Sequence, residues 1–140
     1  MRIIGIDYGK KRCGLSVTDN LQIIATHLVS VASNDLLSYL KGYCEKEVVE
    51  GFVIGKPLKL NNQLNEIAKD IVELKIKLNQ CFPDKYIEEI DERFTSKIAF
   101  QSILDSGVGK EKRKNKANID VVAAVIILQN YLDLKSNLNK

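Results

Sequence analysis

The order of the apolar segments is the feature of this sequence that most restricts its fold. Three short apolar segments follow one another near the start of the chain, at residues 2–7, 13–18 and 23–31, and each has the pattern of a strand. From residue 34 onward, helical segments alternate with strand segments. Consecutive strands tend to pair antiparallel, whereas strands joined through helices pair in parallel. The sequence therefore predicts an α/β fold in which a mixed sheet carries helices on its faces.

Capping and helix-ending residues divide the remainder of the chain into further elements. They are a helix from Asn34 to about Glu47, a strand over 48–54, a helix from Asn61 or Asn62, a strand from Tyr86 to about Asp91, a short helix from Thr95 and a last helix from about Asn118. In the last helix, residues 121–128 are apolar nearly all round, so we expect this segment to pack deeply against the sheet.

Length and composition favour one domain over residues 1–140. The chain has 140 residues, of which 45% are hydrophobic, and this is enough for one core but not for two. Cys13, Cys44 and Cys81 are far apart and form no CxxC pair, so we expect reduced core thiols rather than a zinc site. The apolar stretch at the N-terminus is too short for a signal-peptide core, and no apolar run approaches the length of a membrane span. We therefore expect a cytoplasmic protein with no membrane partner.

Acidic residues stand at the ends of three of the expected elements. Asp7 directly follows the apolar run Ile3–Ile6, and Asp120 lies in the first turn of the last helix. Asp7 could be a metal ligand, or it could pair with Arg12 or cap a turn. Asp120 could be a ligand too, although a carboxylate in a first turn is also favoured by the helix dipole.

The third group is the acidic end of the strand that begins at Tyr86. Strand alternation places Glu88 on one side of the sheet with Glu92, and Glu89 on the other side with Asp91. Periodicity alone leaves open which side faces solvent. Acids from a first strand, a later strand and a last helix could converge on hard cations, which prefer oxygen ligands and which assist phosphodiester cleavage. His27 is the only histidine, so no competing histidine-based site is indicated.

Basic residues gather in two short clusters, although the net charge is only +3. One cluster is Lys10, Lys11 and Arg12. The other lies within residues 110–116 and includes Lys112, Arg113 and Lys114. Such clusters suit a phosphate backbone, although both could equally be solvated loops.

Four stretches together resemble the YqgF/RuvX family, whose members are called pre-16S rRNA nucleases or Holliday junction resolvases. The stretches are 5–14 (GIDYGKKRCG), 53–58 (VIGKPL), 91–96 (DERFTS) and 119–124 (IDVVAA) with 127–129. Each motif alone is weak, but their order and spacing over nearly the whole chain are specific. The resemblance implies a ribonuclease H-like fold, with a five-stranded mixed sheet whose first three strands are antiparallel.

The resemblance also implies a function and its residues. Asp7, Glu92 and Asp120 match the catalytic, metal-binding acids, and the implied cofactor is Mg²⁺ or Mn²⁺. Arg93 would contact phosphate or support a ligand. The implied substrate is structured RNA, the 5′ end of pre-16S rRNA in precursor ribosomal particles, with branched DNA as the alternative.

Two departures from the family pattern bear on the site. The usual acidic, glycine-containing turn is replaced by Lys59-Leu60-Asn61-Asn62. The fourth carboxylate expected close to Asp120 is absent from residues 121–125, and Asp91 is only a weak substitute for it.

Two other classes of function compete with the nuclease. A noncatalytic nucleic-acid-binding assembly factor would need no acid site. An actin-like ATPase also begins with a strand and phosphate loop like residues 7–14, but it needs two such domains, and 140 residues supply one.

Overall fold

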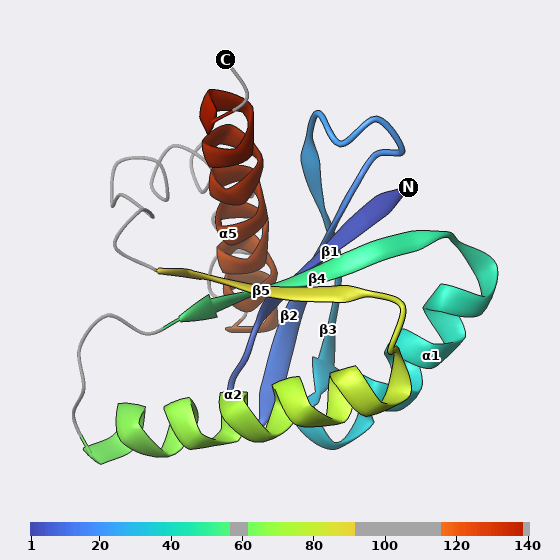
Figure 1. The fold of residues 1–140 in the computed structure, drawn as a ribbon. Helices are drawn as coiled ribbons and strands as arrows, with labels where there is room; N and C mark the ends of the chain where they lie inside the picture. Colours follow the sequence, from blue (N-terminus) through green and yellow to red (C-terminus); the bar gives the residue numbers. More distant parts are fainter. Residues whose placement is uncertain (57–61, 92–115, 139–140) are drawn as a thin grey trace.

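A computed structural model describes residues 1–56, 62–91 and 116–138 of the chain, except for the side chains of 62–65, 91, 116–121, 137 and 138. In these ranges the chain forms five strands, three α-helices and one 3₁₀ turn (Figure 1). In chain order they are β1 (Arg2–Asp7), β2 (Arg12–Thr18), β3 (Ala25–Ala32), η1 (Ser33–Asp35), α1 (Leu36–Lys46), β4 (Val49–Lys56), α2 (Asn62–Cys81), β5 (Tyr86–Asp91) and α5 (Lys116–Leu138).

The strands form one mixed sheet in the order β3-β2-β1-β4-β5. The consecutive strands β1, β2 and β3 pair antiparallel, while β1 with β4 and β4 with β5 pair in parallel. This is the sheet predicted from the order of the apolar segments, because strands joined by short turns pair antiparallel and strands joined through helices pair in parallel. The fold is ribonuclease H-like.

Helices cover both faces of the sheet, and each face has its own core. On one face, Ile4, Ile6, Phe52 and Ile54 pack with apolar residues of α1 and α2. On the other face, α5 packs across β1, β2, β3 and β4 and buries its apolar stretch there (Figure 1). The deep packing expected for 121–128 is confirmed over the described side chains from Val122 to Leu128.

The backbone of α5 comes close to the sheet at Gly5. A Cβ atom at this position would lie 2.9 Å from Cβ of Leu128 and 3.2 Å from the Ala124 carbonyl oxygen, and it would also collide with the Ser16 hydroxyl. Ser16, which pairs with Gly5 across β1 and β2, is fully buried and donates a hydrogen bond of 2.7 Å to that carbonyl oxygen. Gly5 and Ser16 therefore set both the distance and the position of α5 on the sheet.

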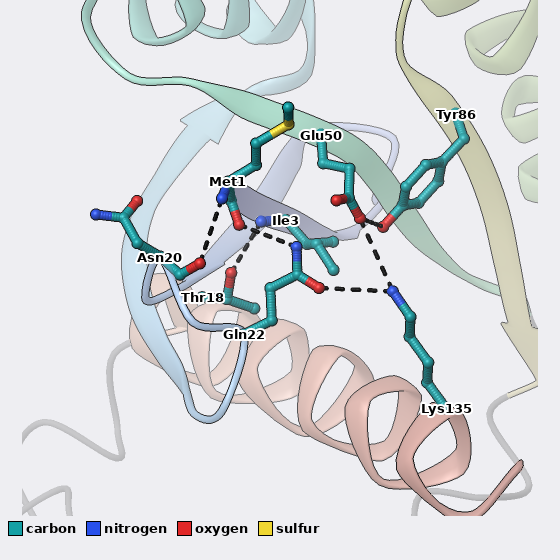
Figure 2. Close-up of polar contacts among 8 residues, drawn as sticks. All are labelled: Met1, Ile3, Thr18, Asn20, Gln22, Glu50, Tyr86 and Lys135. Carbon is teal, nitrogen blue, oxygen red and sulfur yellow. Dashed lines mark hydrogen bonds and ion pairs between the residues drawn. The ribbon is translucent and has the colours of Figure 1, made fainter. Parts of the chain in front are cut away.

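Polar contacts hold the C-terminal half of α5 at the edge of the sheet where β1, β4 and β5 begin (Figure 2). Lys135 Nζ lies 3.8 Å from a Glu50 carboxylate oxygen and 3.5 Å from the Gln22 side-chain oxygen. The Tyr86 hydroxyl donates to Glu50 at 3.0 Å, and burial, with this bond, raises the pKa of Tyr86. Gln22 in turn donates to the Met1 carbonyl at 3.0 Å, so the network joins α5 to β4, β5 and the β2–β3 turn.

Several predicted boundaries differ from the structure. Asn34 does not cap a helix, because η1 occupies residues 33–35 and α1 begins at Leu36 with Asp35 at its N-cap. Strand β4 continues through Gly55 to Lys56, since the parallel ladder with β5 extends to that residue. The three cysteines are free thiols, but only Cys13 is buried. The short helix expected from Thr95 lies outside the described residues.

We expect Gly5→Ala to lower the free energy of unfolding by about 1–3 kcal/mol, because the added methyl group forces α5 away from the sheet. Gly42→Ala is the matched control. No heavy atom lies within 4 Å of a Cβ built at Gly42 inside α1, so alanine there should raise the free energy of unfolding by about 0.5–1 kcal/mol. Urea unfolding of the three proteins measures both changes. Equal stability of Gly5→Ala and wild type would contradict the close docking of α5.

Candidate active site

The carboxyl ends of the three parallel strands define one edge of the sheet. Strand β1 ends at Asp7, β4 at Lys56 and β5 at Asp91, and Lys56 pairs with Asp91 at the end of the ladder. In open α/β sheets, ligands bind in the crevice outside the carboxyl ends of the strands. Asp7 stands at this edge, as its position after a central apolar run predicts.

The side chain of Asp7 belongs to the face that α5 covers. Side chains alternate along a strand, and Gly5, two residues earlier, contacts α5. On this face the neighbours of Asp7 in the sheet are glycines. Gly14 pairs with Asp7 on β2, and Gly55 follows directly after Ile54, the β4 partner of Ile6. Both glycines are buried, so the strands beside this half-buried carboxylate contribute backbone and no side chains.

Contacts with the helices now assign the acids of β5 to the two faces. Lys75 of α2 forms a 3.3 Å ion pair with Glu89, which lies on the α2 face. Tyr131 of α5 has Glu88 as a hydrogen-bond partner, and burial, with this bond, raises the pKa of Tyr131 to about 12. Glu88 and the buried Ile90 therefore lie on the α5 face, the face of Asp7. The choice that periodicity left open is resolved for the described part of β5.

Asp120 is the fifth residue of α5, and its side chain is outside the description. The helix runs from this end toward Lys135, which contacts Glu50 near the start of β4. Ala124, one turn after Asp120, contacts β1 at Gly5. The four helical residues from Ala124 back to Asp120 cover about 6 Å, close to the roughly 6.6 Å spanned by the two strand residues from Gly5 to Asp7. The helix backbone at Asp120 thus extends toward the edge where Asp7 lies.

The other residues predicted for the site lie outside the described residues, namely Glu92, Arg93, Lys112, Arg113 and Lys114. Glu92 is the next residue of the chain after the last residue of β5. Within the described part of the chain, no three acidic, histidine or cysteine side chains gather as a metal-binding group. Asp7 is the one member of the predicted acidic triad whose side chain the structure describes.

The β1–β2 loop beside Asp7 is tightly folded. A Cβ at Gly9 would lie 2.5 Å from the Arg12 carbonyl oxygen, so this turn requires glycine. Ser33 donates to the Gly9 carbonyl at 2.5 Å, and its own backbone N–H donates to the Lys11 carbonyl at 2.9 Å. Ser33, at the start of η1, therefore fixes the loop through hydrogen bonds to the carbonyl groups of both Gly9 and Lys11.

The three basic residues of this loop differ in their surroundings. Lys10 forms an ion pair with Glu66 of α2, and this contact raises the pKa of Lys10. Lys11 is exposed, whereas Arg12 is half-buried at the start of β2. Lys11 is therefore the residue of this cluster most accessible to a phosphate group.

Comparison with known families gives a match over nearly the whole chain. The model of the RuvX family, described as Holliday junction resolvase, matches residues 1–134. The chain belongs to the RuvX family. RuvX relatives named pre-16S rRNA nuclease are 49% identical in Porphyromonas gingivalis over 132 residues, and 47% identical in Flavobacterium johnsoniae over 134 residues. These alignments cover 94% and 96% of this chain and 96% and 97% of the relatives. Both names denote nucleases, so this RuvX protein is a member of a nuclease family.

Solved structures support the fold assignment for this RuvX chain. Thermus thermophilus RuvC in complex with a Holliday junction substrate matches with a TM-score of 0.60 at 13% identity, over 96% of each chain. The fowlpox virus Holliday junction resolvase matches with a TM-score of 0.56 at 9% identity, over 96% of this chain and 99% of that one. At these identities the likeness concerns the fold alone.

Sequence reasoning missed the residues that frame the site in this RuvX protein. Gly14 and Gly55 were visible in the motifs, but their position beside Asp7 follows only from the strand register. The Ser16 contact with Ala124 joins residues 108 apart and leaves no periodic signal. No helix in the described ranges combines the length and apolar character needed to cross a bilayer.

Proposed function

We propose that this protein is a metal-dependent nuclease whose catalytic residues are Asp7, Glu92 and Asp120. The observation that carries the proposal is the position of Asp7, which lies at the carboxyl edge of the sheet, on the α5 face, between two buried glycines. A carboxylate in such a setting can be approached by a sugar–phosphate backbone, because no neighbouring strand side chain stands over it.

Two observations favour the other two acids. Glu92 follows Ile90 by two positions and Glu88 by four, and both of those residues lie on the α5 face. Residues at such even spacing share one face of a strand. Asp120 precedes Ala124 and Leu128 at four-residue intervals, and both of these residues are fully buried where α5 meets β1. Extending the strand alternation and the helical stripe by one step would bring both carboxylates toward Asp7.

The donor set fits a hard divalent cation, which we propose to be Mg²⁺ or Mn²⁺. Three carboxylates offer the oxygen ligands that such ions prefer, and the described neighbours of Asp7 add no thiol or imidazole to this set on the α5 face. When bound, the ion would stabilise charge on the phosphate and lower the pKa of an attacking water molecule. Asp7 itself would orient the ion from a fixed strand end, since β1 is hydrogen-bonded on both sides.

The proposed substrate is structured RNA, with maturation of pre-16S rRNA as the process. The names of relatives at 47–49% identity support this choice. We extend the proposal to precursor ribosomal particles as partners of the protein. The family description favours a second candidate, cleavage of four-way DNA junctions. Parallel cleavage assays with a pre-16S rRNA fragment and a DNA junction separate the two functions, because the acids are common to both. We propose that the protein acts in the cytoplasm.

Nucleic-acid contacts are proposed for the basic residues on either side of the acids. Lys11 is exposed next to the β1 end, and Lys10 and Arg12 flank it. Arg93 adjoins Glu92, while Lys112, Arg113 and Lys114 precede α5 and Asp120 in sequence. These positions suit contacts with phosphates, which position a strand and give binding its salt dependence.

Replacing Asp7 tests the chemistry. Asp7→Asn should reduce cleavage on the order of 100-fold or more, because the amide keeps the size of the side chain but removes the charge that holds a cation. RNA affinity should stay close to wild type, since basic residues neutralise the phosphates. Cleavage of a pre-rRNA fragment over a series of Mn²⁺ concentrations measures the first effect, and fluorescence anisotropy measures the second.

Asp84→Asn is the control for this substitution. Asp84 is exposed in the α2–β5 connection, at the opposite edge of the sheet from Asp7, and its substitution removes the same negative charge. The Asp84→Asn protein should cleave RNA as fast as wild type. If Asp7→Asn cleaves as fast as Asp84→Asn, Asp7 is not a catalytic ligand. If wild type itself is inactive but binds RNA, the protein is a noncatalytic assembly factor.

The basic segment before α5 is tested by the salt dependence of binding. Changing Lys112, Arg113 and Lys114 to alanine should weaken binding and reduce the slope of log affinity against log salt concentration by up to about 2–3, because each phosphate contact contributes about 0.7–0.9 to the slope. Changing Lys41 and Lys46 to glutamine, at exposed positions of α1, removes two positive charges away from this segment and measures the effect of net charge alone. A slope equal to that of the control would show that residues 112–114 do not contact phosphates.

A further inference from the structure

A cavity of about 210 Å³ lies beside the end of β1, on the face of the sheet opposite to Asp7. It is enclosed by the β1–β2 loop, the start of α1 and one side of α2. Tyr8, the residue directly after Asp7, forms part of its lining. The cavity and the carboxylate of Asp7 are therefore neighbours around one strand end, although they open on opposite faces.

The apolar part of the cavity is lined by residues of the hydrophobic core. Leu36 and Leu74 line it and belong to the core, being 1% and 6% exposed. The Tyr8 ring is half-buried and packs against the same core. Burial raises the pKa of the Tyr8 phenol, and the charge of Asp70 adds to this effect. The hydroxyl therefore remains a neutral hydrogen-bonding group beside an aromatic surface.

The polar lining of the cavity combines carboxylates, amino groups and neutral polar side chains. Its members are Asp70, Glu73, Lys10, Lys77, Ser33 and Asn34. The ammonium group of Lys10 is engaged by Glu66 outside the cavity lining, so the two carboxylates face one other cation, Lys77. The resulting excess of negative charge, beside a neutral phenol, disfavours a phosphate group. The two carboxylates favour a flat ligand that presents N–H donors and an apolar face.

We propose that this cavity receives an unpaired nucleobase bearing an exocyclic amino group, in the strand that the proposed nuclease site cleaves. This inference rests on the proposed function. Carboxylates accept hydrogen bonds from amino groups on base edges, and bases pack against aromatic side chains. The volume is sufficient, since a cavity of about 150 Å³ in another protein holds benzene. A base bound here would fix the register of the strand relative to Asp7.

The test uses short oligouridines that carry a single cytidine, moved through every position. Cytosine and uracil differ at the exocyclic group, where an amino donor replaces a carbonyl acceptor. At one position, cytidine should increase the cleavage rate, and the affinity of the inactive Asp7→Asn protein, by about tenfold, as expected for one hydrogen bond to a charged acceptor. In Asp70→Asn and Glu73→Gln proteins this ratio should fall toward one.

Glu45→Gln, at an exposed position near the other end of α1, is the matched control and should retain the preference. A cytidine effect that is absent at every position, or one that persists in both the Asp70 and Glu73 variants, would overturn the inference. Cleavage without base preference would leave the nuclease proposal standing. If no oligonucleotide is cleaved, the assay with the pre-16S rRNA fragment decides the nuclease proposal, and fluorescence anisotropy of the labelled oligonucleotides decides whether the cavity selects a base.

Discussion

The contact between α5 and the sheet at Gly5 is the constraint on which the rest of the structure depends. Only a residue without a side chain lets the helix backbone come this close, and the buried hydroxyl of Ser16 then fixes the helix by donating to the Ala124 carbonyl. Together with the ion pair between Lys135 and Glu50, this contact sets the direction of α5 along β1. It thereby determines that the start of the helix, with Asp120, extends toward the strand end that carries Asp7.

Most of the fold could be predicted because it follows from local periodicity. The change from consecutive strands to alternating strands and helices gave the mixed sheet, and the apolar segment 121–128 gave a helix buried against it. The boundaries were less predictable where tertiary contacts compete with capping preferences. Asn34 has a good capping side chain, but Ser33 holds the β1–β2 loop, and the chain forms a 3₁₀ turn before α1 begins.

The candidate site was predictable in part, for a different reason. A carboxylate after a central apolar strand is visible in sequence, so the position of Asp7 at the carboxyl edge of the sheet could be predicted, while its role as a ligand stays a prediction. The face on which each acid of β5 lies could not be predicted, because strand alternation divides the acids into two equivalent groups. Only the contacts of Lys75 with Glu89 and of Tyr131 with Glu88 show which group faces which helix. Contacts between distant elements, such as Ser16 with Ala124, and the cavity beside Tyr8 depend on the folded packing and have no local pattern.

The most direct test of the central claim is to map Mn²⁺ onto the protein by paramagnetic broadening of its amide NMR signals. If the three acids share a cation, the signals of Asp7, Gly14, Glu92 and Asp120 should broaden first as Mn²⁺ is added, while those near Glu50 should stay sharp. Mg²⁺ in excess should restore the signals. Broadening centred on another part of the molecule, or broadening around Asp7 that leaves Glu92 and Asp120 unaffected, would contradict a shared metal site.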